Sequence, residues 1–201
     1  MALSQQVLVV LGFAFLASQT VLGYDPTITM DYGIANATSG DNFTSTAYEA
    51  QKLPTPNGGL QLVPQFVAQF PGVKGLGISS LYFIAGPGVE VPPHIHPRAT
   101  ELFMVITGTW YVGFIDTNNK LFTANLNPGD LFIFPISLIH FQLVTGTGNA
   151  TGVSSFNSEN PGVSLIPTAL FESIPSLEDI VLAKAFNVSI TEIETIKVNL
   201  A

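Results

Sequence analysis

Short runs of apolar, β-branched and aromatic residues, each closed by turn-forming residues, dominate the middle of the chain. The runs occupy residues 77–86, 101–115, 120–126 and 130–134, and the turn pairs are Pro87-Gly88, Thr107-Gly108, Asn118-Asn119 and Pro128-Gly129. No amphipathic helices alternate with these runs, as a parallel α/β sheet would require. The pattern predicts an all-β fold, an antiparallel sandwich or barrel, with a jelly roll as the leading architecture.

A different spacing begins near the C-terminus. Ser176 precedes the apolar-rich segment 177–186, and Asp179 follows it at the third position, a combination typical of a helix start. A second short helix is predicted over 191–197. Its apolar stripe consists of Ile190, Ile193 and Ile196, and this stripe requires cover from the protein's own barrel or from a neighbouring subunit.

The N-terminal region divides into a leader and a polar arm. Residues 7–17 form an apolar run of signal-peptide length, too short for a comfortable membrane span, so we predict a signal peptide over 1–23. A buried N-terminal strand or a membrane anchor is the alternative, because no Lys or Arg precedes the run. The predicted order is signal peptide 1–23, N-terminal arm 24–64, β-barrel 65–175 and C-terminal helical extension 176–201.

The composition limits which kinds of molecule the chain can bind. Apolar residues make up 47% of the 201 residues and charged residues 10%, and 6 Lys and Arg against 14 Asp and Glu give a net charge of -8. This charge repels nucleic acid and anionic membranes, so neither is expected as a partner of the mature chain. Cysteine is absent, which excludes disulfides, thiolate metal sites and a cysteine nucleophile.

The chain also contains four Asn-x-Ser/Thr triplets, which fit passage through a glycosylating secretory pathway. The candidate asparagines are Asn36, Asn42, Asn149 and Asn187. They agree with secretion to the extracellular space, cell wall or matrix.

The three histidines carry the strongest chemical signal. His94 and His96 are two residues apart, so on a strand they point to the same face. Two neutral imidazoles converging in a barrel interior lack hydrogen-bond partners, and a cation between them resolves the conflict. Glu101 lies five residues after His96, so on an uninterrupted strand its side chain would point to the opposite face. A break at residues 97–99 can turn it inward. His140 is 44 residues beyond His96, so only the tertiary fold can bring it close to the other three.

Three imidazoles and one carboxylate suit Mn(II), Fe(II), Ni(II) or Zn(II), and disfavour Cu(I) and calcium. A six-coordinate ion on His94, His96, Glu101 and His140 would keep two positions for water or a small substrate. One carboxylate against a divalent ion leaves net positive charge, so a small anion or an oxygen species is the expected guest. The alternative is a set of packed core histidines without a metal.

Two boxes of sequence resemble the germin-like proteins and spherulins of the cupin superfamily. The first box runs from Gly88 to Gly108 and contains the His-x-His pair and Glu101; the second runs over 128–142 and contains His140. Flanking similarity covers residues 70–79, 109–115 and 156–167. The resemblance implies a cupin jelly-roll barrel, Mn(II) on the four residues above, and secretion. It also implies homo-oligomers (dimers, trimers or hexamers) formed through barrel edges and C-terminal helices, with oxalate oxidase or superoxide dismutase activity.

The chain departs from that family pattern in three places. The N-terminal cysteine pair of plant germins is missing, Val91 stands where oxalate-oxidising germins carry an asparagine, and Val144 replaces another asparagine after His-Phe-Gln. Loss of an oriented amide donor near a carboxylate costs about 1–3 kcal/mol. Oxalate oxidation is therefore the less favoured enzymatic hypothesis.

Two functions compete at this point. The first is manganese-dependent redox chemistry on superoxide, with a small carboxylic acid such as oxalate as the second enzymatic version. The alternative is a non-enzymatic wall, spore-coat or storage protein whose barrel binds carbohydrate or serves structure. Arg98, the only arginine, can steer anions, although pairing with a surface carboxylate is the favoured interpretation.

Overall fold

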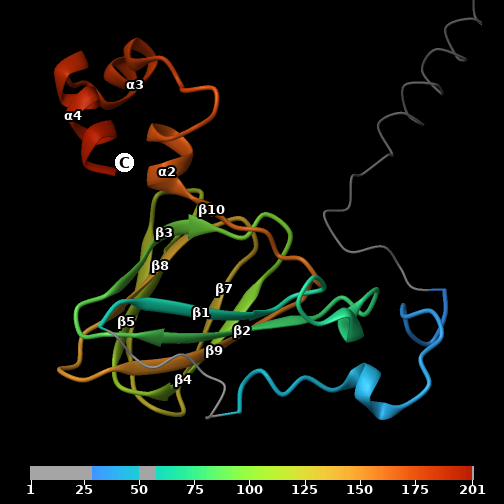
Figure 1. The fold of residues 1–201 in the computed structure, drawn as a ribbon. Helices are drawn as coiled ribbons and strands as arrows, with labels where there is room; N and C mark the ends of the chain where they lie inside the picture. The colour runs from blue at the N-terminus through green and yellow to red at the C-terminus, as the bar shows by residue number, and fades with distance from the viewer. Residues whose placement is uncertain (1–28, 50–57, 201) are drawn as a thin grey trace, which may run out of the picture.

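Two antiparallel five-stranded sheets face each other in a computed structural model that describes residues 29–49 and 58–200 (Figure 1). One sheet has the order β1 (Leu60–Gln65), β2 (Ser79–Ala85), β9 (Ala150–Phe156), β4 (Glu101–Thr107), β7 (Leu131–Phe134). The other has the order β10 (Ser164–Leu165), β3 (Glu90–Ile95), β8 (Ile139–Val144), β5 (Trp110–Ile115), β6 (Leu121–Leu126). The prediction of an all-β jelly-roll fold is confirmed.

The turn at Gly108 divides the long apolar run 101–115 into β4 and β5. Gly108 has φ +75°, and a Cβ at this position would lie 2.4 Å from the Ala150 Cβ. Only glycine meets both demands without strain. The chain therefore reverses where the sequence pattern predicted a turn.

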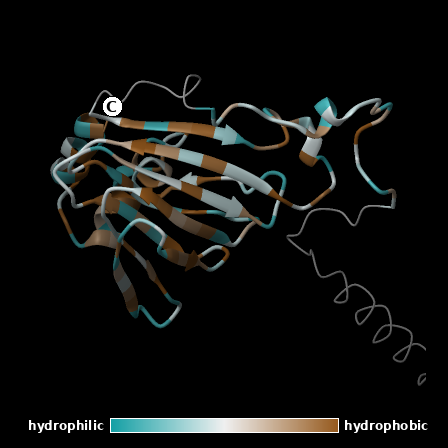
Figure 2. Ribbon diagram, turned by 90° about the horizontal axis from the view of Figure 1, so that it is seen from below, coloured by the Kyte–Doolittle hydropathy of each residue, from teal (hydrophilic) through white to brown (hydrophobic). Residues whose placement is uncertain are grey.

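Alternation along the strands places the core between the sheets. In β4, Glu101, Phe103 and Val105 are buried, whereas the residues between them are exposed. Figure 2 shows the same alternation of hydrophobic and hydrophilic positions along the strands. Phe103 packs edge-on against Phe83 and Trp110, with ring centroids 5.7 and 5.3 Å away. Each such buried side chain contributes about 1.5–3 kcal/mol.

The first strand of the barrel begins earlier than the predicted arm boundary. Residues 29–49 contain the 3₁₀ turn η1 (Gly40–Phe43), and the Tyr48 hydroxyl donates to Ser80 Oγ of β2 at 2.9 Å. Residues 60–64, assigned to the arm on the sequence, instead belong to β1 and pair with β2. β1 contains Pro64, and an edge strand tolerates the missing N–H. The predicted signal peptide, residues 1–23, lies outside the described residues.

The C-terminal helices form a small unit at one end of the barrel (Figure 1). They are α2 (Ile166–Phe171), α3 (Asp179–Phe186) and α4 (Ile190–Leu200). Helix α2 lies within the range predicted as barrel, so the helical part begins directly after β10 and ten residues before the predicted start at 176. Ile193 is fully buried beside Leu182, whereas Ile190 and Ile196 remain 44% and 37% exposed. The predicted stripe is thus only partly covered within the chain.

Ser176 does not cap the first predicted helix. Helix α3 starts at Asp179 with Glu178 at the N-cap and no side-chain cap bond. Ser176 Oγ instead accepts a hydrogen bond from Lys197 Nζ of α4 at 2.9 Å. The Ser176 hydroxyl therefore links the segment before α3 to α4. Within 29–49 and 58–200, no helix has the length and apolar character needed to cross a membrane.

Candidate metal centre

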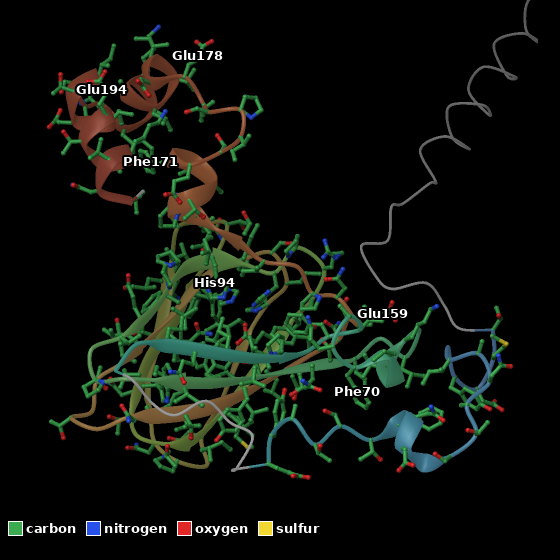
Figure 3. The ribbon with its side chains drawn as sticks, in the orientation of Figure 1. Phe70, His94, Glu159, Phe171, Glu178 and Glu194 are labelled. Carbon is green, nitrogen blue, oxygen red and sulfur yellow. The ribbon has the colours of Figure 1, made fainter. Side chains whose placement is uncertain are left out.

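Four residues from both sheets converge inside the barrel. His94 of β3 and His140 of β8 are direct cross-strand partners, so their side chains emerge side by side from one sheet. Glu101 is the first residue of β4 in the facing sheet, and His96 follows the last residue of β3. Figure 3 shows His94 inside the barrel, near the end that carries the helices.

The connection between β3 and β4 turns Glu101 inward. β3 ends at Ile95, a turn covers residues 97–98, and β4 begins at Glu101. The break that the sequence placed at 97–99 therefore resets which side chains face the core. All four side chains are buried, with exposures of 3% for His94, 5% for His96, 0% for Glu101 and 1% for His140.

The four residues offer a compact set of donor atoms. One nitrogen or oxygen from each lies within 4.8 Å of all the others. Glu101 Oε2 is 3.0 Å from His96 Nε2 and 3.2 Å from His140 Nε2. The His94 and His140 rings have centroids 4.1 Å apart. The group can therefore bind a metal ion without rearrangement of the backbone.

Backbone carbonyls determine which imidazole nitrogen is free. The Nδ1 atoms of His94, His96 and His140 contact the carbonyl oxygens of Pro92, Gly162 and Leu138 at 2.8, 2.5 and 2.8 Å. A carbonyl only accepts, so in the neutral rings Nδ1 carries the proton and Nε2 keeps its lone pair. Metal-binding histidines typically make such a contact through the ring nitrogen that does not bind the metal. The residues present thus fit a divalent cation, which would remove the repulsion between the Nε2 lone pairs and Glu101.

A second layer orients the carboxylate. Ser154 Oγ donates to Glu101 Oε1 at 2.5 Å, and Gln142 Nε2 donates to the same oxygen at 3.2 Å. Both donors are fully buried. Because they engage Oε1, Oε2 faces the histidines. The sequence analysis did not single out these two residues. Gln142 could have been found from its position two residues after His140, on the same face of the strand, whereas no local pattern points to Ser154.

The protonation states favour metal binding. Burial, with a further contribution from His140, lowers the pKa of His94 from 6.5 to about 4, against the opposing effect of Glu101. Burial alone would raise the pKa of Glu101, but hydrogen bonds donated by His140 and His96 when their rings are protonated outweigh burial and hold that pKa well below its ordinary value. At neutral pH His94 is thus a neutral donor and Glu101 an anion.

Aromatic side chains restrict the imidazoles. The Phe134 ring stacks on His140 with centroids 4.6 Å apart, and the Phe156 ring meets His96 edge-on at 4.8 Å. These contacts limit ring rotation and exclude water from two sides of the site.

A cavity of about 250 Å³ opens onto His94 and His96. Apart from these histidines its lining residues are apolar or glycine, and Val91 is among them. Phe103 lies in the core, and Phe141 packs against Tyr111 instead of lining the cavity. Val144 is 1% exposed in the core. Of the two valines that replace asparagines of the family pattern, only Val91 lies beside the cavity.

Arg98 stabilises a loop beside the site. Its Nε donates to the carbonyl of Asn160 at 2.7 Å and its Nη2 donates to Asn160 Oδ1 at 3.1 Å. Arg98 thus has the predicted structural role, but its partner is Asn160 and not the carboxylate that we expected. Because Gly162 of the same loop contacts His96 Nδ1, Arg98 helps to orient a candidate ligand.

The four candidate glycosylation sites lie on the surface. Asn36, Asn42, Asn149 and Asn187 are all exposed, and none contributes to the barrel core. Their positions leave room for a glycan, and glycosylation stays a prediction.

Comparisons with known proteins agree with the fold. The Cupin family model matches residues 47–194. The putative germin-like protein 2-2 of Oryza sativa subsp. japonica is 38% identical over 96% of this chain and 95% of its own length. Germin-like protein subfamily T member 2 of Arabidopsis thaliana is 39% identical over 81% of this chain and 74% of its own length.

A solved structure extends the likeness to three dimensions. An oxalate oxidase in complex with the substrate analogue glycolate superposes with a TM-score of 0.80 at 33% identity, covering 88% of this chain and 98% of that one. Sequence and structure together show that this chain belongs to the germin-like proteins of the cupin family.

Proposed function

We propose that the chain is a secreted manganese protein and an oxidoreductase that acts on superoxide. The observation that carries the proposal is the buried group of His94, His96, Glu101 and His140, with each histidine Nδ1 engaged by a carbonyl and each Nε2 available. Three nitrogens and one oxygen are a donor set that suits Mn(II), with Fe(II), Ni(II) or Zn(II) as the competing ions.

The chain's residues would hold the ion and set its environment. Manganese, when bound, supplies one-electron redox chemistry. His94, His96 and His140 contribute no charge, so Glu101 alone offsets the two positive charges of the ion. The remaining positive charge favours a small anion such as superoxide. Ser154 and Gln142 hold Glu101 in position through Oε1, which keeps the geometry constant as the charge of the site changes.

The cavity favours superoxide over oxalate. Oxalate bound through one carboxylate has a second that needs a donor beyond the metal, and the cavity presents Val91, Leu81 and other apolar side chains there. A carboxylate left without a partner loses about 1–3 kcal/mol or more. Superoxide has no second charged group and avoids this cost.

Elemental analysis of the purified, secreted protein followed by two assays tests the proposal. We expect about one manganese per chain, superoxide removal, and no hydrogen peroxide from oxalate. His140→Ala and Glu101→Ala should lose the metal and the activity together, whereas Ser155→Ala, an exposed position next to the buried Ser154, should keep both. Stoichiometric manganese in Glu101→Ala would contradict the site assignment.

We also propose that the mature chain is an extracellular homo-oligomer. Leu102, Met104, Leu131 and Ile133 are between 36% and 57% exposed on the outer face of β4 and β7, and the two strands pair in register there. The helices expose further apolar residues. Contiguous exposed apolar surface favours association. Light scattering should give a mass of a dimer, trimer or hexamer; a monomer at micromolar concentration would contradict it.

The second candidate function is non-enzymatic binding of carbohydrate. A separate cavity of about 440 Å³ lies between residues 43–48 and the barrel, and hydroxyl groups of Ser45, Ser79 and Ser80 and the rings of Phe70 and Phe156 line it. Hydroxyls beside aromatic faces suit a sugar ring. Saturable binding of a wall saccharide by a metal-free protein, without superoxide removal by the metal-loaded one, would favour this function.

A further inference from the structure

The cavity beside the metal centre is larger than superoxide requires. Its volume is about 250 Å³, and an apolar cavity of about 150 Å³ is enough to bind benzene in another protein. The cavity therefore has room for one substituted six-membered ring. A diatomic anion would leave most of it to water against apolar walls.

The walls come from two strand edges that face each other. β1 is an edge strand of one sheet and β10 is an edge strand of the other. Leu81, Phe83 and Val91 form the inner wall, with exposures of 6%, 2% and 6%, while Leu62 and Val163 are 46% and 63% exposed at the rim. The cavity thus leads from solvent to the buried histidines.

The only polar side chains among the lining residues are the two candidate ligands. His94 and His96 border the cavity, and their Nδ1 atoms are already engaged by carbonyls. A guest therefore has one partner available for a charged group, the metal, and must otherwise be uncharged. A charged group placed elsewhere in the cavity would be desolvated without a partner.

We propose that this cavity binds a single-ring aromatic ligand through a catechol-type oxygen head, with the ring between Leu81, Phe83 and Val91 and the head towards His94 and His96. The proposal rests on the proposed function, because the head requires a bound cation. The Phe66 and Phe83 rings among the lining residues favour an aromatic guest, since aromatic pairs gain from edge-to-face and offset contacts. The ligand thus carries its charge at the oxygen head and has no charged group on the rest of the ring.

Two catechols that share the pair of adjacent hydroxyl groups and differ in their ring substituents test the proposal. 4-Nitrocatechol and disulfonated catechol are titrated under nitrogen into manganese-loaded protein, and the catecholate absorbance is followed. We expect saturable binding of one 4-nitrocatechol per manganese and at least tenfold weaker binding of the disulfonated compound, because its sulfonates cannot enter apolar surroundings. Equal affinities would overturn the proposal.

A pair of matched variants tests the wall. Val91→Asn keeps the side-chain volume and makes the wall polar, and we expect about tenfold weaker binding of 4-nitrocatechol with unchanged manganese content. Val153→Asn, on the opposite face of β9 from the buried Ser154, should bind as the parent does. Val91→Thr keeps the branched shape and serves if the asparagine variant fails to fold. Unchanged affinity in a folded Val91 variant would overturn the proposal.

The outcomes separate the two proposals. Protein that holds manganese and removes superoxide but does not bind 4-nitrocatechol refutes the aromatic ligand and leaves the proposed function intact. Protein that takes up no divalent ion refutes both. Equal binding of 4-nitrocatechol to metal-free and metal-loaded protein would refute the role of the oxygen head.

Discussion

The metal-free protein should lose stability as the pH falls, because His94 resists protonation in the folded state. Burial lowers its pKa from 6.5 to about 4. In the unfolded chain the ring takes up a proton near pH 6.5, whereas the folded protein does so only near pH 4. Over that window the unfolded state binds more protons, so the free energy of unfolding falls as the pH falls.

The magnitude follows from the size of the shift. Each pKa unit corresponds to about 1.4 kcal/mol, so the shift of His94 from 6.5 to about 4 costs the folded state about 3 kcal/mol by pH 4. Glu101 acts in the same direction at lower pH. Its pKa is held below the ordinary value of 4.5, so its stabilisation is fully present above that pH and is lost only as the pH falls towards the folded pKa.

Urea unfolding of metal-free protein between pH 7 and pH 4 measures this effect. Trp110 is the only tryptophan and is fully buried, so its fluorescence reports unfolding. His94→Gln removes the titrating ring and should flatten the dependence between pH 6.5 and pH 4. A free energy of unfolding that is the same at pH 6.5 and pH 4, or an unchanged slope in His94→Gln, would refute the reasoning.

Two further changes have expected outcomes. Ser154→Ala removes the hydrogen bond to Glu101 Oε1 and should weaken manganese binding about tenfold, as measured by competition with a metal indicator; an affinity equal to that of Ser155→Ala would contradict the positioning role. Gly108→Ala places a Cβ 2.4 Å from a neighbouring side chain at φ +75° and should lower the free energy of unfolding by about 1–3 kcal/mol. Gly148→Ala, where a Cβ meets nothing within 4 Å, is the control, and equal thermal midpoints for the two variants would count against the strain.

Local patterns in the sequence were sufficient for β2, β4, β5, β6 and β7 and for the four candidate ligands. Strand alternation and turn pairs such as Thr107-Gly108 depend on neighbouring residues, and so does the spacing of His94 and His96. The inward direction of Glu101 also has a local cause, because the turn near residues 97–99 changes which side chains of the following strand face the core. Such features are determined by steric preferences over a few residues.

Only the tertiary structure decided what surrounds the ligands. Ser154 reaches Glu101 because β9 pairs with β4, and Gly162 reaches His96 across 66 positions of sequence. The cavity exists because the edges β1 and β10 lie opposite each other, and β1 itself starts inside the predicted arm because its partner β2 supplies the hydrogen bonds. These contacts depend on the pairing of distant strands, and local preferences carry no information about which strands pair.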